Sequence, residues 1–175
     1  MPTLVSPGNG KATSDNTPWL DWSDVTDPSG VRYQLQVDDK ADFSSPQVNL
    51  TSLRYSSYTL PVTADGTFYW RAGAVDGVGN VSGWTDAWTF NVDTKAPPAP
   101  SLKSPADDSA SSDSTPWLDW SDVSDATAVH YQLQVDDNKD FSSLVESKTW
   151  LNSSSWTVTT LLPDGMYYWR VKAVD

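Results

Sequence analysis

The sequence contains no cysteine, and it contains only one histidine among 175 residues. The absence of cysteine excludes disulfide bonds, thiol catalysis and thiolate metal sites. Long hydrophobic runs are also missing, since no stretch approaches the roughly 20 apolar residues that span a bilayer. Residues 1–10 lack the basic start and the apolar stretch of a secretion signal, so any export signal is expected outside these residues.

Positive charge is scarce as well. The 11 lysines and arginines stand against 23 acidic residues, which leaves a formal net charge of −12. Such a charge repels phosphate backbones and anionic lipid surfaces, so we expect no nucleic-acid partner and no membrane insertion. Aromatic residues, by contrast, make up 12% of the chain, with 10 tryptophans and 7 tyrosines. That much ring surface predicts a packed protein rather than a disordered one.

The chain consists of two copies of one repeat. Three stretches recur: TPWLDWSDV at 17–25 and 115–123, YQLQVDD at 33–39 and 131–137, and DGTFYWRAGAVD at 65–76 as DGMYYWRVKAVD at 164–175. The spacing is 98 residues for the first two stretches and 99 for the third, so the second copy carries one inserted residue. A unit of about 100 residues is the usual size of a seven-stranded β-sandwich.

Alternating patterns predict β-strands. In residues 31–37 the apolar side chains Val, Tyr, Leu and Val occupy every second position, which is the period of a strand with one face in water. Residues 68–74 and 88–92 alternate in the same way. Turn residues separate these segments, and no stretch has a helical period. We therefore expect an all-β chain.

The segment DTKAPPAP, residues 93–100, forms the junction between the copies. Proline donates no hydrogen bond to a sheet and favours extended backbone, so three prolines here predict a short, stiff connector and a rod of repeats. We therefore expect two domains, residues 1–97 and residues 98–175.

The strand sequences resemble the fibronectin type III-like repeats of microbial surface proteins, which are also grouped with bacterial immunoglobulin-like domains. In that family an early strand carries a core tryptophan, matched here by Trp22 and Trp120. A later strand begins with a corner tyrosine, which Tyr167 matches and Phe68 replaces in the first copy. The resemblance implies two tandem fibronectin type III-like (Ig-like) β-sandwiches, without the tyrosine's hydrogen bond in the first.

The second copy lacks its last strand. In the first copy a final strand is expected at about 87–93, whereas the second copy stops at Asp175. The strand that carries Tyr168, Trp169 and Val171 is therefore expected to form an open edge, which invites pairing with another chain. Two explanations stand. The sequence is a piece of a longer array, or a neighbouring subunit donates a strand and builds a filament.

No arrangement of residues indicates catalysis. The only histidine, His130, lies on the wet face of a predicted strand, and Arg32 replaces it in the other copy. No serine occurs in a G-x-S-x-G elbow, and no glycine-rich loop is present to hold a phosphate. Glu146 is the single glutamate, and most aspartates occupy turns. We expect no enzyme activity and no organic cofactor.

Aspartates are the candidates for a metal site. Asp24 and Asp27 are spaced three apart in turns, as are their counterparts Asp122 and Asp125. Calcium takes about six to eight oxygen ligands, which such carboxylates and nearby carbonyls can supply. Aspartate also caps turns without any metal, and the spacing departs from that of the EF-hand calcium loop. The sequence leaves both interpretations open.

Some tryptophans are expected inside the fold and others at its surface. If Leu20 points inward, Trp19 points outward, and Trp117 does the same in the second copy. Such rings can stack on sugars or pack against another subunit. Trp84 is expected to lie over the guanidinium of Arg71, a cation–π contact worth roughly 0.5–2 kcal/mol. The remaining structural tryptophans are expected to be Trp22, Trp70, Trp120 and Trp169.

The leading hypothesis is a non-catalytic structural or adhesive module, a spacer or rod of an extracellular or cell-surface protein. Its partners are then neighbouring repeats or identical subunits. One alternative is a filament subunit that receives a donated strand at the open edge of the second domain. Another is a carbohydrate-binding appendage of a secreted enzyme, which makes glycans the partners.

Overall fold

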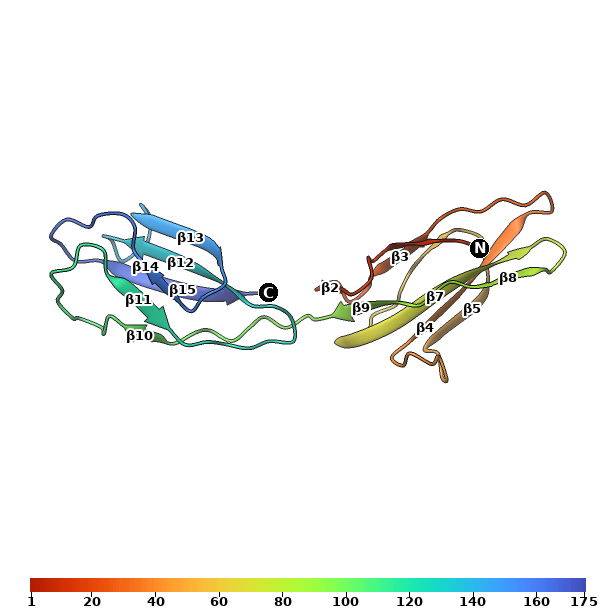
Figure 1. Ribbon diagram of the computed structural model, residues 1–175, viewed down its shortest axis with the longest axis horizontal. Coiled ribbons are helices and arrows are strands. Elements are labelled where there is room, and N and C mark those ends of the chain that lie inside the picture. Colours follow the sequence, from red (N-terminus) through yellow and green to blue (C-terminus); the bar gives the residue numbers. More distant parts are fainter. The chain divides into compact units, whose positions relative to one another are not determined.

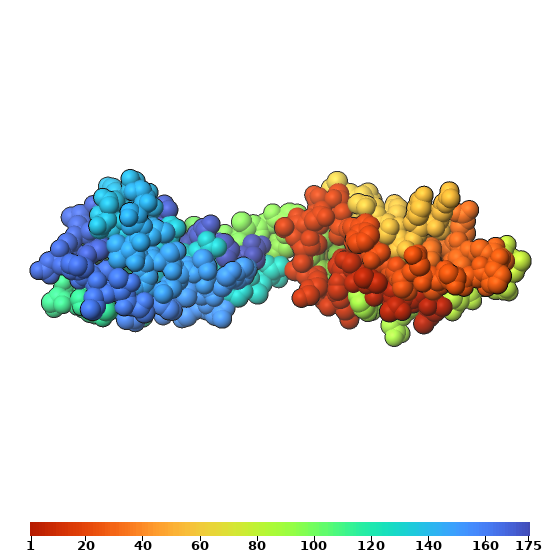
Figure 2. Space-filling view, turned by 90° about the horizontal axis from the view of Figure 1, so that it is seen from above, coloured from red at the N-terminus to blue at the C-terminus, as the bar shows by residue number.

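The computed structural model describes residues 1–175, and all of its regular elements are β-strands (Figure 1). The chain divides into two compact units, unit 1 (Met1–Lys95) and unit 2 (Ala96–Asp175). Each unit is built from one continuous stretch of the chain (Figure 2). The all-β prediction is confirmed, and the division lies two residues before the expected boundary. No helix that could cross a membrane is found.

Unit 1 contains nine strands in two sheets. The strands are β1 (Leu4–Ser6), β2 (Lys11–Thr13), β3 (Trp19–Trp22), β4 (Val31–Asp38), β5 (Val48–Leu53), β6 (Ser57–Thr59), β7 (Gly66–Asp76), β8 (Val81–Trp84) and β9 (Trp88–Val92). One sheet has the order β1-β3-β6, and the other has the order β2-β9-β7-β4-β5, with β8 also paired to β7. All neighbours are antiparallel except β2 and β9, which are parallel.

Unit 2 contains six strands in two sheets of three. The strands are β10 (Leu102–Ser104), β11 (Trp117–Trp120), β12 (His130–Asp136), β13 (Glu146–Leu151), β14 (Ser155–Thr157) and β15 (Tyr168–Val174). The sheet orders are β10-β11-β14 and β13-β12-β15. Unit 2 has no counterpart of β2, β8 or β9, so β15 lies at the edge of its sheet (Figure 1).

The core of unit 1 is built around Trp22. Its ring meets Tyr33 edge-on at 5.8 Å and Trp70 at 6.4 Å between centroids. The alternation expected for the central strands matches the burial, since the inward residues of β4, β7 and β9 are buried except Val31 and Trp88, which are partly buried. The buried apolar residues are Leu4, Leu20, Trp22, Tyr33, Leu35, Val37, Leu60, Phe68, Trp70, Ala72, Ala74, Phe90 and Val92.

The core of unit 2 repeats this arrangement on a smaller scale. Trp120 meets Tyr131 at 5.6 Å and Trp169 at 6.3 Å. The buried apolar residues are Leu118, Trp120, Tyr131, Leu133, Val135 and Val158. None of them comes from β15. Trp169 is only half-buried, whereas its counterpart Trp70 is fully buried, because no strand of unit 2 covers that side of β15.

The corner position also differs between the units. The hydroxyl of Tyr167 donates a hydrogen bond to the carbonyl oxygen of Pro163 at 3.1 Å. Phe68 has no hydroxyl, and its ring stacks instead on Phe90 of β9, with 5.5 Å between centroids. Unit 1 therefore holds this corner by ring packing against its last strand, and unit 2 holds it by a hydrogen bond.

Candidate functional site

Two exposed tryptophans occupy equivalent places in the two units. Trp19 begins β3 and Trp117 begins β11, and each is 51% exposed. The next residues, Leu20 and Leu118, are buried, as the strand period predicts. Each unit thus presents one indole on the outer face of one sheet, β1-β3-β6 in unit 1 and β10-β11-β14 in unit 2. A ring in this position offers an apolar face and a polar N–H to a ligand or a neighbouring molecule.

Arg71 on β7 is held between two aromatic rings. Its guanidinium carbon lies 4.9 Å from the centroid of Trp84, which is the contact expected from the sequence, and 4.1 Å from that of Phe43. Its Nε and Nη2 both donate to Oε1 of Gln36, at 2.9 and 2.7 Å. The contact between Trp84 and Arg71 thus attaches β8 to the face of β7. Arg71 therefore has a structural role.

Phe43 was missed from the sequence, although a signal for it existed. Phe43 and Phe141 both have positive φ, 52° and 55°, which is rare for residues other than glycine. Both stand in the repeated DFSS stretch, where the Asp42 carboxylate accepts a hydrogen bond from the amide of Ser44 at 3.0 Å. The recurrence of the DFSS sequence in both copies was the signal that its phenylalanine makes the same contact in each unit.

Arg170 of unit 2 has only one of these ring contacts. Its guanidinium carbon lies 4.0 Å from the centroid of Phe141, and its Nε donates to Oε1 of Gln134 at 2.7 Å. No counterpart of Trp84 is present in unit 2, so the guanidinium is exposed.

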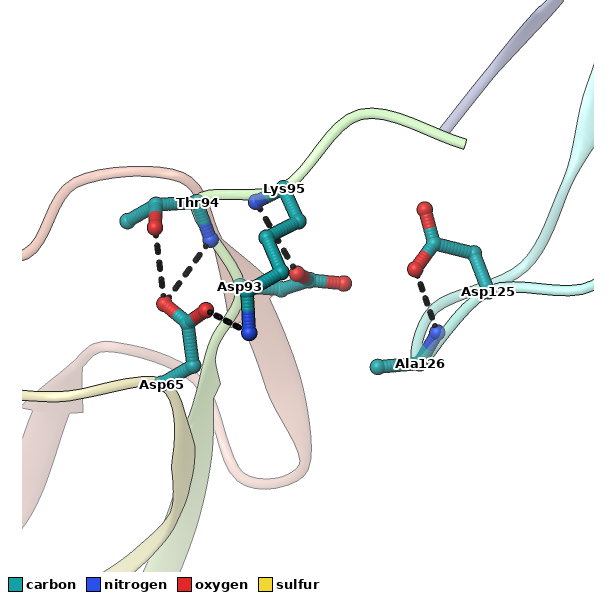
Figure 3. A network of polar contacts seen from close by, with 6 residues as sticks. All are labelled: Asp65, Asp93, Thr94, Lys95, Asp125 and Ala126. Carbon is teal, nitrogen blue, oxygen red and sulfur yellow. Dashed lines mark hydrogen bonds and ion pairs between the residues drawn. The ribbon is translucent and has the colours of Figure 1, made fainter. Parts of the chain in front are cut away.

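The aspartates singled out as metal ligands lie in the loops that follow β3 and β11. Oδ1 of Asp27 accepts hydrogen bonds from the amide and hydroxyl of Ser29, at 2.9 and 2.7 Å. Oδ1 of Asp24 accepts one from Tyr33 at 3.4 Å. In unit 2, Oδ1 of Asp125 accepts the amide of Ala126 at 2.7 Å (Figure 3). Its neighbour in the motif, Asp122, is exposed. The contacts of Asp27 and Asp125 are local backbone caps, whereas Asp24 binds a tyrosine of β4, and calcium at these positions stays a prediction.

Asp65, before β7, fixes the chain directly after β9. Its Oδ1 accepts hydrogen bonds from the hydroxyl and the amide of Thr94, at 2.8 and 3.1 Å (Figure 3). Its Oδ2 forms an ion pair with Nζ of Lys95 at 3.2 Å. The hydrogen bond from the Thr94 hydroxyl, followed by the contact with Lys95, lowers the pKa of Asp65. Asp164 occupies the same position in unit 2.

Glu146 is a buried carboxylate in unit 2. It accepts hydrogen bonds from Nε1 of Trp156 at 2.7 Å and from the amides of Thr159 and Thr160 at 2.9 and 2.8 Å. Lys148 lies 3.7 Å away. Burial opposes ionisation of this group, but the hydrogen bonds, led by that from the Thr160 amide, outweigh burial and lower the pKa of Glu146 to about 2. The carboxylate is therefore a fixed acceptor that joins β13 to β14 and the following loop.

His130 is a surface residue in a small polar and aromatic cluster. Its Nδ1 lies 2.8 Å from Oδ1 of Asn152, and its ring centroid lies 4.9 Å from that of Trp150. Trp150 is 62% exposed and has a φ of 59°. This ring was not singled out from the sequence, because unit 1 has Ser52 at the same position. The histidine is paired with an amide oxygen, not with a nucleophile.

An open groove runs along unit 2 beside β15. Its volume is about 1240 Å³. Apolar side chains of the core form its floor: Leu118, Val135, Val158, Leu162, Tyr167 and Trp169. Tyr168, which also lines it, and Val171 were expected at an open edge, and both lie half-buried on β15. The groove combines an apolar floor with a free strand edge, which are the two components of a site that binds an extended peptide.

Comparison with known proteins identifies the fold. No protein-family model matches the chain, and no curated protein matches it. Among solved structures, the FN1–FN3 domains of chicken CNTN1 match with a TM-score of 0.58 and 15% identity, over 99% of this chain and 62% of that one. The fibronectin(III)-like modules of Clostridium thermocellum CbhA match with a TM-score of 0.57 and 15% identity, over 99% of this chain and 85% of that one. The chain has a fibronectin type III-like fold.

The predicted fold family is therefore confirmed at the level of structure. The fibronectin type III-like likeness covers nearly the whole chain, both units included. The chain spans less than two thirds of the CNTN1 structure. At 15% identity the likeness concerns the backbone fold, and it assigns no role to individual side chains of this chain.

Proposed function

We propose that the chain is a non-catalytic structural module whose two units act as a spacer or adhesive rod of an extracellular or cell-surface protein. The observation that carries this proposal is the equivalence of the two cores. Trp120 and Tyr131 meet at 68°, the same interplanar angle as in unit 1. The repeated motifs TPWLDWSDV and YQLQVDD supply these core strands. The residues that the two copies share are chiefly those that build the core strands of the sandwich.

The side chains that differ between the copies support the same proposal. His130 is replaced by Arg32, and Trp150 is replaced by Ser52. A site that both copies used for chemistry would need the same reactive residues in both. The shared features are instead core rings and turn aspartates, as expected for a module repeated for its shape. The likeness to the fibronectin(III)-like modules of CbhA agrees with a modular role.

A measurement of how stiff the connector is tests the spacer role. The prolines Pro97, Pro98 and Pro100 favour extended backbone between the units. We expect small-angle X-ray scattering to give a narrow distribution of long dimensions for the wild type. Replacing the three prolines by glycine and serine should broaden that distribution and shift it to shorter values. Identical distributions for the two proteins would contradict a spacer role.

Carbohydrate binding is a second candidate, which the matched tryptophans favour. Trp19 and Trp117 are each 51% exposed at equivalent positions, and an exposed indole can stack on a sugar ring. In a glycan array, the Trp19→Ala, Trp117→Ala double variant should lose any binding that the wild type shows. Trp150→Ala is the matched control, because this ring is also exposed but has no counterpart in unit 1. A silent wild type, or a double variant that binds equally well, rules this candidate out.

Filament assembly by strand donation is the third candidate, and the free edge of β15 favours it. Every strand of unit 1 is already paired within its own sheets, so a copy that donated one would break its own pairing. Light scattering over a concentration series separates the outcomes. A mass that grows with concentration supports assembly, and a constant monomer mass contradicts it.

A further inference from the structure

A polar cavity lies in unit 1 between the loop that follows β3 and the link from β5 to β6. Residues 24–27 line one side of it, and residues 54–57 line the other. Its volume is about 520 Å³, within the range of about 300–1,000 Å³ that small-molecule sites occupy. Trp19 does not line it, because this tryptophan begins β3 and the cavity lies beyond the end of that strand.

Hydrogen bonds hold both sides of this cavity in place. The hydroxyl oxygen of Ser29 accepts the amide of Gly77 at 3.0 Å, which ties the loop after β3 to the end of β7. On the other side, the carbonyl oxygen of Ser56 accepts the amide of Trp22 at 3.0 Å. A site whose walls are fixed before a ligand arrives loses less conformational entropy on binding.

Two carboxylates give the cavity hydrogen-bond acceptors. Asp24 and Asp27 both line it, and both are exposed. In each of them the bonds from the protein end on Oδ1, which accepts the hydroxyl of Tyr33 in Asp24 and the amide and hydroxyl of Ser29 in Asp27. Oδ2 of each carboxylate is left for a ligand, and such an oxygen accepts hydrogen bonds from hydroxyl groups.

Arg54 adds donors on the opposite side of the cavity. Its side chain is exposed and takes no part in the ion pairs of the chain, which are formed by Lys95 and Lys148. A guanidinium group donates hydrogen bonds and accepts none, whereas the hydroxyls of Thr26 and Ser57, which also line the cavity, can do both. The cavity therefore offers donors and acceptors side by side, the combination that a series of hydroxyl groups requires.

Tyr55 places an aromatic ring beside these polar groups. It lines the cavity, is 69% exposed, and has the guanidinium carbon of Arg54 at 5.8 Å from its ring centroid. The ring takes no part in the core cluster of unit 1. Its apolar face is free to stack on the C–H face of a sugar.

Unit 2 keeps both aspartates of this cavity but not its other two main side chains. Asn152 and Ser153 stand where unit 1 has Arg54 and Tyr55. Oδ1 of Asn152 is already paired with Nδ1 of His130, at 2.8 Å. Unit 2 thus lacks both the ring and the cationic donor, so this combination of groups belongs to unit 1 alone.

We propose that the cavity of unit 1 binds a neutral hexose sugar. Tyr55 lies beneath the sugar ring, and the hydroxyl groups of the sugar bind Asp24, Asp27 and Arg54. A neutral ligand is favoured because the two carboxylates repel acidic sugars and the guanidinium repels amino sugars and basic side chains. This binding depends neither on the spacer role nor on the exposed tryptophans of β3 and β11.

Amide NMR spectra of the 175-residue chain test this site. The isotope-labelled protein is titrated with the methyl glycosides of glucose, galactose and mannose. For at least one of them we expect saturable shifts of residues 24–27 and 54–57, with a dissociation constant of about 1 mM. The counterpart residues 122–125 and 152–155 of unit 2 are the internal control and should not shift. No saturable shift of the unit 1 residues with any of the three sugars overturns the proposal.

Substitutions of Tyr55 test the role of its ring. Tyr55→Ala should weaken sugar binding at least about tenfold, whereas Tyr55→Phe keeps the ring and should retain the binding. Both variants should unfold at the wild-type temperature, because this side chain lies outside the core. Arg54→Gln should weaken the binding several-fold by removing the cationic donor. Equal binding by the wild type and Tyr55→Ala overturns the proposal.

Two controls identify the class of ligand and the place where it binds. Free lysine and glutamate are titrated in the same way, and both should bind more weakly than the sugars. Tighter binding of either amino acid at residues 24–27 and 54–57 overturns the proposal, because the cavity then serves a charged ligand. The Trp19→Ala, Trp117→Ala double variant should bind the sugars as the wild type does. Loss of sugar binding in that variant would place the sugar on the exposed tryptophans instead and would also overturn the proposal.

Discussion

Single residues differ between the two units in ways that can be compared directly. Glu146 stands in unit 2 where unit 1 has Val48, and Trp156 stands where unit 1 has Tyr58. The two changes belong together, since the indole of Trp156 donates to Glu146 at 2.7 Å. A buried carboxylate is stable only when hydrogen bonds replace its water, and here they do.

Glu146 predicts how unit 2 responds to acid. Its folded-state pKa of about 2 lies below the ordinary value of 4.5. The contribution of the Glu146 carboxylate to the stability of unit 2 is therefore complete above about pH 4.5, and it is lost as the pH falls towards 2. At neutral pH, Glu146→Gln should lower the free energy of unfolding by about 1–3 kcal/mol, and this difference should shrink across that window. Denaturation followed through the indole N–H signal of Trp156 measures it. A difference that does not change with pH would contradict this account.

Gly77 predicts a sharp steric effect in unit 1. A Cβ at this position would overlap the backbone carbonyl oxygen of Ser29. Gly77→Ala should therefore destabilise unit 1 by about 1–3 kcal/mol. Gly8→Ala is the control, because the nearest atom to its Cβ is the flexible side chain of Lys11 at 3.4 Å. Thermal unfolding of both variants makes the comparison, and similar losses in both would refute the steric explanation.

Sequence reasoning reached some of these residues and not others. The strand period predicted that Trp19 faces outward, because successive side chains of a strand point to opposite faces of the sheet and this alternation depends only on the local sequence. The contact of Trp84 with Arg71 was also expected from the sequence. The pocket of Glu146 was not predicted, since its partners Thr159 and Thr160 belong to a loop whose position depends on the tertiary fold.

At the scale of elements, long alternating strands were predictable and short ones were not. β4, β7 and β9 follow the expected residue ranges closely. The strands β1, β2, β10 and β14 have three residues each, too few to show a period. In β13 the pairing with β12 shifts between Tyr131 and Leu133, which interrupts the alternation. The contribution of residues 106–111 to the groove of unit 2 was not predicted, because it depends on the position of this loop in the tertiary fold.

Replacing Arg71 and replacing Arg170 should lower stability by unequal amounts. Arg71 lies between two rings and donates two hydrogen bonds, whereas Arg170 contacts one ring and donates one. Arg71→Ala should therefore cost unit 1 about 1 kcal/mol more than Arg170→Ala costs unit 2. Chemical denaturation, with each unit followed by its own tryptophan signals, gives both values. Equal losses would mean that Trp84 contributes nothing to the attachment of β8.

On the scale of the whole molecule, one sequence pattern produces two units of different completeness. Unit 1 covers its strand β7 with β9, and the buried core includes Phe90 and Val92 from that last strand. Unit 2 keeps the same central tryptophan, tyrosine and leucine but leaves β15 half-covered. The repeat and its fold followed from the sequence, and so did the open edge. The groove beside this edge could be found only from the structure.

Amide hydrogen exchange tests this central difference most directly. In the 175-residue chain, the amides of β7 that face β9 should be protected, because they are hydrogen-bonded within a covered sheet. The equivalent amides of β15, which face the groove, should exchange at least about 100-fold faster, while its amides that face β12 stay protected. Equal protection of both sides of β15 would contradict an open edge and would show that another segment already covers it.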